Sequence, residues 1–140
     1  MTTPYCTEDA LLRDEGVRLK PYRDSVGKLT IGIGRNLDDV GISLAEARML
    51  LANDLEKVQS QISASLPWVR NLSVARQSVV ENMAFNLGVN GLMAFKETLA
   101  WMEAGNYSAA ADAMLQSVWA RQVGVRAERL AAQMRTGEWQ

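Results

Sequence analysis

The spacing of apolar residues after residue 43 constrains the fold more than any other feature of this sequence. Four of them follow one another at steps of four, three and four, which is the spacing of one helical face: Leu51, Leu55, Val58 and Ile62. Just before them, Ser43 and Glu46 form the pattern of a capping box, which opens a helix. The sequence therefore predicts one long helix over about 43–64.

A shorter helix is predicted before this one, within residues 1–15. Thr7 is placed to cap it, and Gly16 is expected to end it, because glycine is the common residue just beyond a helix. Between Gly16 and the long helix lies the one stretch with strand character, within about 16–42. Its β-branched residues on both sides of the turn at Gly27 predict a hairpin.

Residues 65–140 are helical in pattern. Ser73 is expected to cap a helix that Gly88 ends, and the pair Asn90-Gly91 predicts a turn. Ser108 is expected to cap a later helix, and Gly137 to follow the last one. Two tryptophans fall on apolar faces and are expected in the core: Trp101 and Trp119.

These segments predict an α+β fold of one domain over residues 1–140, and most of it should be helical. A small lobe over about 16–42 would hold the hairpin, and the helix over about 43–64 would link it to a larger lobe. That helical lobe would contain about 65–140 together with the N-terminal helix, 1–15.

The sequence contains no histidine, and this absence excludes several kinds of catalysis. Ser-His-Asp and Cys-His mechanisms and histidine-ligated zinc all require it. The lone Cys6 has no partner for an internal disulfide and no histidine base, so it is expected to be inert. General acid–base chemistry then falls to carboxyl groups, lysine or tyrosine, and we expect no metal and no cofactor.

Charge and hydrophobicity narrow the choice of partners further. The formal net charge of −1 gives no strong field toward nucleic acid. No apolar run approaches the ~20 residues of a membrane-spanning helix, so we expect no membrane insertion. The start of the chain lacks the basic and then apolar pattern of a secretion signal, so we expect synthesis and folding in the cytoplasm.

Two carboxyl groups and one hydroxyl group are candidates for the chemistry. Glu15 ends the first helix, where the negative end of the helix dipole favours a protonated acid. Asp24 lies in the hairpin, and Thr30 on its opposing arm, so the two side chains could hold a water. Glycoside hydrolysis typically uses such a pair of carboxyl groups. The alternatives are a solvated glutamate, an Asx-type turn residue and a threonine chosen for its β-propensity.

The strings around these residues closely resemble one family. Residues 15–24 match the pattern E-G-x-x-L-x-x-Y-x-D, and residues 30–34 match T-x-G-x-G, as in the phage-type lysozymes, the endolysins of glycoside hydrolase family 24. The resemblance implies that Glu15 is the acid, that Asp24 acts through a water and that Thr30 helps to place that water. In this sequence, Gly32 and Gly34 leave one edge of the predicted hairpin without side chains, which permits close approach of another backbone or a ligand.

The resemblance extends into the helical segments. It implies that Phe85, Asn86 and Thr98 contact substrate, although core packing is the alternative for Phe85 and a plain surface position for Asn86. Arg126 could pair with an acid near the cleft. The sequence also departs from the family, because Arg35 stands where many relatives carry a histidine. The short stretch over 36–42 predicts a reduced small lobe.

The resemblance implies hydrolysis of the β-1,4 bond between N-acetylmuramic acid and N-acetylglucosamine in peptidoglycan glycan strands, leading to host lysis. We expect a monomer that reaches the wall in the periplasm after release through a holin-type pore. Two rivals remain open. A lytic transglycosylase would use Glu15 without the water-handling pair, and a wall-binding module would keep the fold without cleavage.

Overall fold

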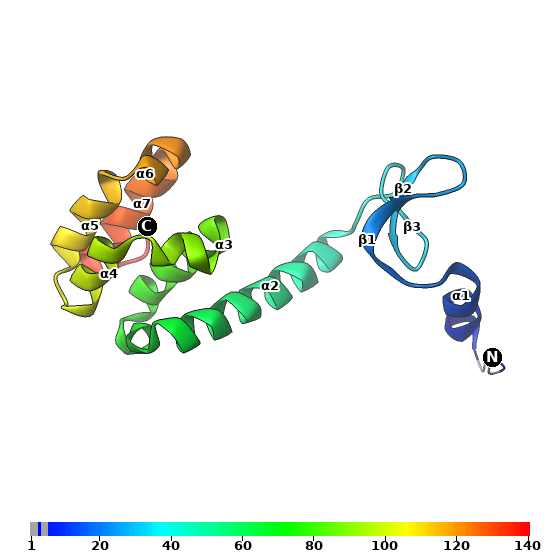
Figure 1. Ribbon diagram of the computed structural model, residues 1–140, viewed down its shortest axis with the longest axis horizontal. Coiled ribbons are helices and arrows are strands. Elements are labelled where there is room, and N and C mark those ends of the chain that lie inside the picture. Colours follow the sequence, from blue (N-terminus) through cyan, green and yellow to red (C-terminus); the bar gives the residue numbers. More distant parts are fainter. Residues whose placement is uncertain (1–2, 4–5) are drawn as a thin grey trace. The chain divides into compact units, whose positions relative to one another are not determined.

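The computed structural model describes Thr3 and residues 6–140, which form helices and a small antiparallel sheet (Figure 1). The helices are α1 (Thr7–Glu15), α2 (Leu44–Ser65), α3 (Val74–Met93), α4 (Lys96–Glu103), α5 (Tyr107–Leu115), α6 (Val118–Val123) and α7 (Val125–Thr136), with a 3-10 helix at Pro67–Asn71. The strands are β1 (Arg18–Arg23), β2 (Leu29–Gly32) and β3 (Arg35–Asn36). The predicted α+β class, mostly helical, is confirmed.

The chain forms two compact units, and the division falls inside α2. The N-terminal unit ends at Met49, and the helical unit runs over Leu50–Gln140. By this division α1 belongs to the first unit. Our prediction that residues 1–15 pack with the helical lobe of a single domain stays a prediction. Among the helices in the described part of the chain, none is long and apolar enough to cross a membrane.

The helical unit contains the apolar core. Within it, α5 packs against α4 and α7, and α7 also packs against α3 and α6 (Figure 1). The largest fully buried side chains come from these helices: Val79, Val80, Met83, Leu92, Met102, Met114 and Met134. Their burial removes apolar surface from water, which is the main source of stability for a helical assembly of this kind.

The helix predicted to end at Gly88 does break there, but it then resumes. Gly88 has φ 75° and ψ 158°, and the backbone returns to helix as far as Met93. Asn90-Gly91 is therefore helical, and the predicted turn is wrong. The reason is tertiary, because Leu92 is completely buried and draws the segment onto the core, which outweighs the local turn preference of the pair.

The caps were predicted correctly in some helices and wrongly in others. The Ser73 side chain accepts a hydrogen bond from the Arg76 N–H, as expected. The cap of α5 is Asn106, which accepts from Ala109 N–H, so the assignment of Ser108 is wrong. Asparagine is an equally good cap and lies closer to the preceding glycine. Thr7 is the first residue of α1 instead of its cap.

The two tryptophans behave differently. Trp119 is 4% exposed and packs edge-on against Phe95, with ring centroids 6.1 Å apart. Trp101 is 38% exposed, so its predicted core position is wrong. Apolar spacing on a short helix defined which residues share a face, but it did not define how far the core covers that face.

The N-terminal unit has a small sheet in the order β1-β2-β3, with both pairs antiparallel. Tyr22 pairs with Thr30, and Thr30 pairs in turn with Asn36, so Thr30 lies on the central strand. Among the described residues of this unit, Thr30 is the one classed as buried. The unit is therefore held together by polar contacts more than by an apolar core.

One such contact network fixes the start of α2. Ser43 N–H donates to Glu46 Oε1 at 2.9 Å, and Glu46 N–H donates to Ser43 Oγ at 3.1 Å, so the predicted capping box is confirmed. Arg35 of β3 donates to the same Glu46 oxygen at 2.7 Å and to the Gly41 carbonyl at 3.2 Å. The Arg35 bond, followed by the bonds with Ser43, lowers the pKa of Glu46 to about 2.

We predict that Glu46→Gln lowers stability at neutral pH, because glutamine keeps the oxygen but loses the charge that faces Arg35. Since folding depresses the pKa of Glu46 from 4.5 to about 2, its contribution is present above about pH 4.5 and fades as the pH falls toward 2. Thermal unfolding of the wild type and of Glu46→Gln, measured from about pH 2 to neutral pH, checks this prediction. The exposed α2 variant Glu56→Gln is the control, and a difference that does not change with pH would contradict the prediction.

Candidate active site

Glu15 lies at the end of α1 with its carboxyl group against the turn between β2 and β3. Gly16 has φ 69° and donates its N–H to the Leu12 carbonyl at 2.9 Å, so it ends the helix as predicted. A Cβ placed on Gly34 would lie 2.8 Å from Glu15 Oε2. The approach of another backbone or a ligand at the two glycines stays a prediction, and the group that lies against Gly34 is a side chain of the same unit.

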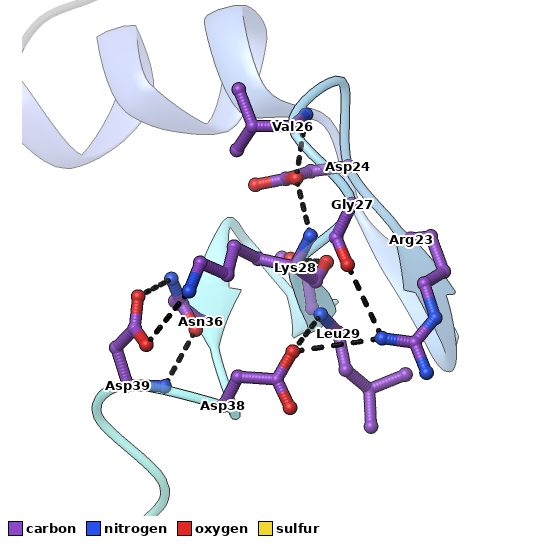
Figure 2. A network of polar contacts seen from close by, with 10 residues as sticks. Arg23, Asp24, Val26, Gly27, Lys28, Leu29, Asn36, Asp38 and Asp39 are labelled. Carbon is purple, nitrogen blue, oxygen red and sulfur yellow. Dashed lines mark hydrogen bonds and ion pairs between the residues drawn. The ribbon is translucent and has the colours of Figure 1, made fainter.

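Asp24 closes the hairpin turn through its carboxylate (Figure 2). Its Oδ1 accepts hydrogen bonds from Val26 N–H at 3.0 Å and from Lys28 N–H at 2.8 Å. The alternative of an Asx-type turn residue is thus confirmed as a structural role. That role involves one oxygen only. In the part of the chain that the structure describes, Asp24 Oδ2 has no hydrogen-bond donor, so it is available to a water.

Thr30 is bonded to the same residue as Asp24. Its hydroxyl donates to the Lys28 carbonyl at 2.9 Å, while Asp24 accepts from the Lys28 N–H. Lys28 therefore orients both side chains through its backbone. Because the only hydrogen of the hydroxyl is already donated, Thr30 can offer a water nothing but an acceptor lone pair. Thr30 is 3% exposed, so little of it is open to solvent.

Two aspartates that sequence reasoning did not single out fix the start of β2 (Figure 2). Asp38 accepts from Leu29 N–H at 2.8 Å and lies 3.6 Å from Arg23 Nη1. Asp39 pairs with Lys28 Nζ at 3.1 Å and accepts from Asn36 at 3.0 Å. A pair of acids in a short loop was the available signal, because such residues commonly bind backbone N–H groups nearby.

Phe85 lies on α3 and is 44% exposed, so the core-packing alternative is wrong for it. It borders a hollow of about 510 Å³ in the helical unit. The lining combines apolar, amide and charged side chains: Asp54, Lys57, Val58, Gln61, Ala84, Val89 and Asn90. An exposed aromatic ring beside polar groups is a surface on which a sugar ring can pack and form hydrogen bonds.

The other predicted contact residues of the helical unit have well-defined surroundings. Asn86 accepts a hydrogen bond from Trp119 Nε1 at 2.8 Å, which leaves its own N–H₂ group free of partners among the described residues. Thr98 is 3% exposed on α4 and offers a ligand almost no surface. Arg126 donates twice to Asn82 Oδ1, at 3.0 and 2.7 Å, so its partner is an amide and neither an acid nor solvent alone.

The structure thus groups the predicted residues by unit. Glu15, Asp24 and Thr30 all lie in the N-terminal unit, whereas Phe85, Asn86 and Thr98 lie in the helical unit. Across residues 6–140 and Thr3, no three histidine, cysteine or acidic side chains gather as metal ligands would. The chemistry available is that of two carboxyl groups with a neighbouring hydroxyl, which is the equipment of acid-catalysed bond cleavage.

Comparison with known proteins gives the class of the chain, that of the phage lysozymes. The family model described as phage lysozyme matches residues 13–135. The chain belongs to the phage lysozyme family. Family membership implies a glycosidase-type hydrolase, and the motif that carries Glu15, Asp24 and Thr30 lies inside the matched residues.

Three relatives show the range of similarity. The chain is 32% identical to the pre-baseplate central spike protein Gp5 of Enterobacteria phage T4, over 92% of this chain and 27% of that protein, so it spans about a quarter of that relative. It is 29% identical to the probable T4-type lysozyme 1 of Dictyostelium discoideum, over 93% and 94%. It is 35% identical to the endolysin of Salmonella phage P22, over 75% of each chain.

We predict that Asn86→Ala lowers the free energy of unfolding by about 1–3 kcal/mol, because it leaves the indole N–H of Trp119 without its acceptor. Asn86→Asp keeps an oxygen at that place and is the matched control, which should retain most of the stability. Urea unfolding followed by tryptophan fluorescence measures both. Equal losses in the two variants would show that the acceptor oxygen is not what Asn86 contributes.

Proposed function

We propose that this protein is a lysozyme that hydrolyses the β-1,4 bond between N-acetylmuramic acid and N-acetylglucosamine in peptidoglycan. The observation that carries the proposal is the exposed Glu15 carboxyl group at the end of α1, in the same unit as Asp24 and Thr30. Membership in the phage lysozyme family supports it, because the match includes all three residues.

Glu15 is the general acid in this proposal. Its side chain is exposed, so a glycan can reach it, and it lies at the C-terminal end of a helix. A protonated carboxyl group in that place donates its proton to the leaving glycosidic oxygen while the C1–O bond breaks.

Asp24 and Thr30 together handle the water. Asp24 presents Oδ2 and Thr30 presents a lone pair on Oγ1, so both are acceptors toward a water. A water that donates both of its hydrogens to these two oxygens has its own lone pairs turned away from them. Attack on the sugar C1 by such a water, with a proton passing to the Asp24 carboxylate, completes hydrolysis.

Substrate contacts on the helical unit belong to the proposal as well. The exposed Phe85 ring offers an apolar face to a sugar, and the free Asn86 N–H₂ offers a donor to an N-acetyl carbonyl. Thr98 is not given a direct contact, because at 3% exposure it offers a sugar ring almost no surface, whereas the equally buried Thr30 has to meet only one water molecule through one oxygen. No cofactor or metal has a step in this chemistry.

The biological setting is the lysis of a bacterial host. We propose that the protein acts as a monomer on the wall in the periplasm, after release from the cytoplasm through a holin-type pore. Similarity to a phage protein named endolysin supports this setting. Binding to nucleic acid and insertion of this protein into a membrane have no part in the proposal.

We predict that Glu15→Gln lowers the rate of peptidoglycan cleavage by about 10²–10⁴-fold, because glutamine cannot donate the proton. Asp24→Asn should also be severely impaired, yet its Oδ1 still accepts from Val26 and Lys28, so the turn stays formed. Loss of turbidity of purified cell walls measures the rates, and circular dichroism checks the fold.

Glu8→Gln is the control, because it removes an acid from the same helix at the opposite end from Glu15. It should cleave walls at the wild-type rate. Wall cleavage at that rate by Glu15→Gln would refute the mechanism. No cleavage by the folded wild type, together with retained wall binding, would favour a binding module instead.

A further inference from the structure

We propose that Gly34 is the positioning residue for the Glu15 carboxyl group: its missing side chain sets where the acid lies. This inference rests on the proposed function, since it assigns Gly34 a part in catalysis through Glu15. The inference gives Gly34, the second glycine of the T-x-G-x-G motif, a role that differs from that of Gly32, the first.

The contact between the two residues is close. A Cβ on Gly34 would lie 2.8 Å from Glu15 Oε2, 3.0 Å from Cδ and 3.3 Å from Cγ, and these are its three nearest neighbours. Real Cβ atoms essentially never come within 3.0 Å of such atoms. Glu15 Oε2 therefore lies where a Cβ at position 34 would not fit, while Cδ and Cγ lie close enough that they would have to move by a few tenths of an ångström.

The Glu15 carboxyl group lies against Gly34 in this unit, so Gly34 limits the positions open to it on that side. Within the described part of the chain, the Glu15 side chain has no hydrogen bond or ion pair to hold it. The glycine backbone, by contrast, is held. The next residue, Arg35, pairs with Ile31 across the sheet and bonds Glu46 at 2.7 Å and the Gly41 carbonyl at 3.2 Å.

A larger residue at position 34 would therefore displace the Glu15 side chain and leave the backbone in place. Glu15 has several rotatable bonds and an exposed end, so moving its carboxyl group costs the fold little. Catalysis responds differently, because a displacement of about 1 Å can lower a rate about 10²-fold. Gly34 thus affects the position of the acid far more than the stability of the protein.

Gly32 provides a matched comparison within the same motif. Its φ is 71° and that of Gly34 is 75°, so an alanine would be equally strained at either position. A Cβ on Gly32 would meet no atom within 4 Å. Gly32 is required for its backbone conformation alone, whereas Gly34 is required for its conformation and for the space that Glu15 occupies.

The experiment compares Gly34→Ala with Gly32→Ala in kcat, KM and thermal unfolding. We expect the two variants to lose similar stability. We also expect kcat to fall about 10²-fold further in Gly34→Ala, with KM close to that of Gly32→Ala. Equal kcat values in the two variants, with activity expressed per folded molecule, would overturn the proposal.

A second measurement separates positioning from general damage. In the Glu15→Gln background, Gly34→Ala should cause no further loss of the residual rate, because the acid it positions is already gone. The ¹³Cδ resonance of Glu15 should shift in Gly34→Ala and stay near its wild-type value in Gly32→Ala. An additive further loss of rate, or no shift in either variant, would overturn the role of Gly34. Full activity of Glu15→Gln alone would instead refute the proposed function.

Discussion

The N-terminal unit depends on a set of polar contacts, because its described residues form no apolar core. Four acidic side chains each bond to backbone N–H groups or to basic side chains: Asp24, Asp38, Asp39 and Glu46. They close the hairpin turn, fix the start of β2 and anchor the first turn of α2. Each bond on an exposed surface is weak by itself, but a connected set holds a short chain segment in one conformation. The geometry of Asp24 and Thr30 follows from this set, through their bonds to Lys28.

This arrangement is compatible with two functions for Asp24, one structural and observed and one catalytic and proposed. One carboxylate oxygen is saturated by two backbone donors and forms the turn, while the other has no partner in the described structure. Structural and chemical roles are therefore compatible here, although they looked like alternatives from the sequence.

Glu15, unlike Asp24, has no structural role through side-chain hydrogen bonds among the described residues. No hydrogen bond in the described part of the chain fixes its side chain, and its carboxyl group is placed by contact with a backbone that has no Cβ.

The fold class was predictable from the sequence, and the candidate residues could be proposed from it, because both depend on local patterns. The capping box at Ser43 and the helix end at Gly16 were predicted and are confirmed. What could not be predicted depends on packing between distant segments. The buried Leu92 overrides the Asn90-Gly91 turn, and the contact between Glu15 and Gly34 joins a helix end to a sheet turn. The motif gave the spacing of these residues along the chain but not the group that approaches the glycine.

Mass spectrometry of the fragments released when the purified protein digests bacterial peptidoglycan tests the central claim most directly. Hydrolysis by a water placed at Asp24 and Thr30 predicts fragments that end in a reducing N-acetylmuramic acid. Fragments that end in 1,6-anhydro-N-acetylmuramic acid would contradict it. In that case no water enters the product, and the protein would act as a transglycosylase through Glu15 alone.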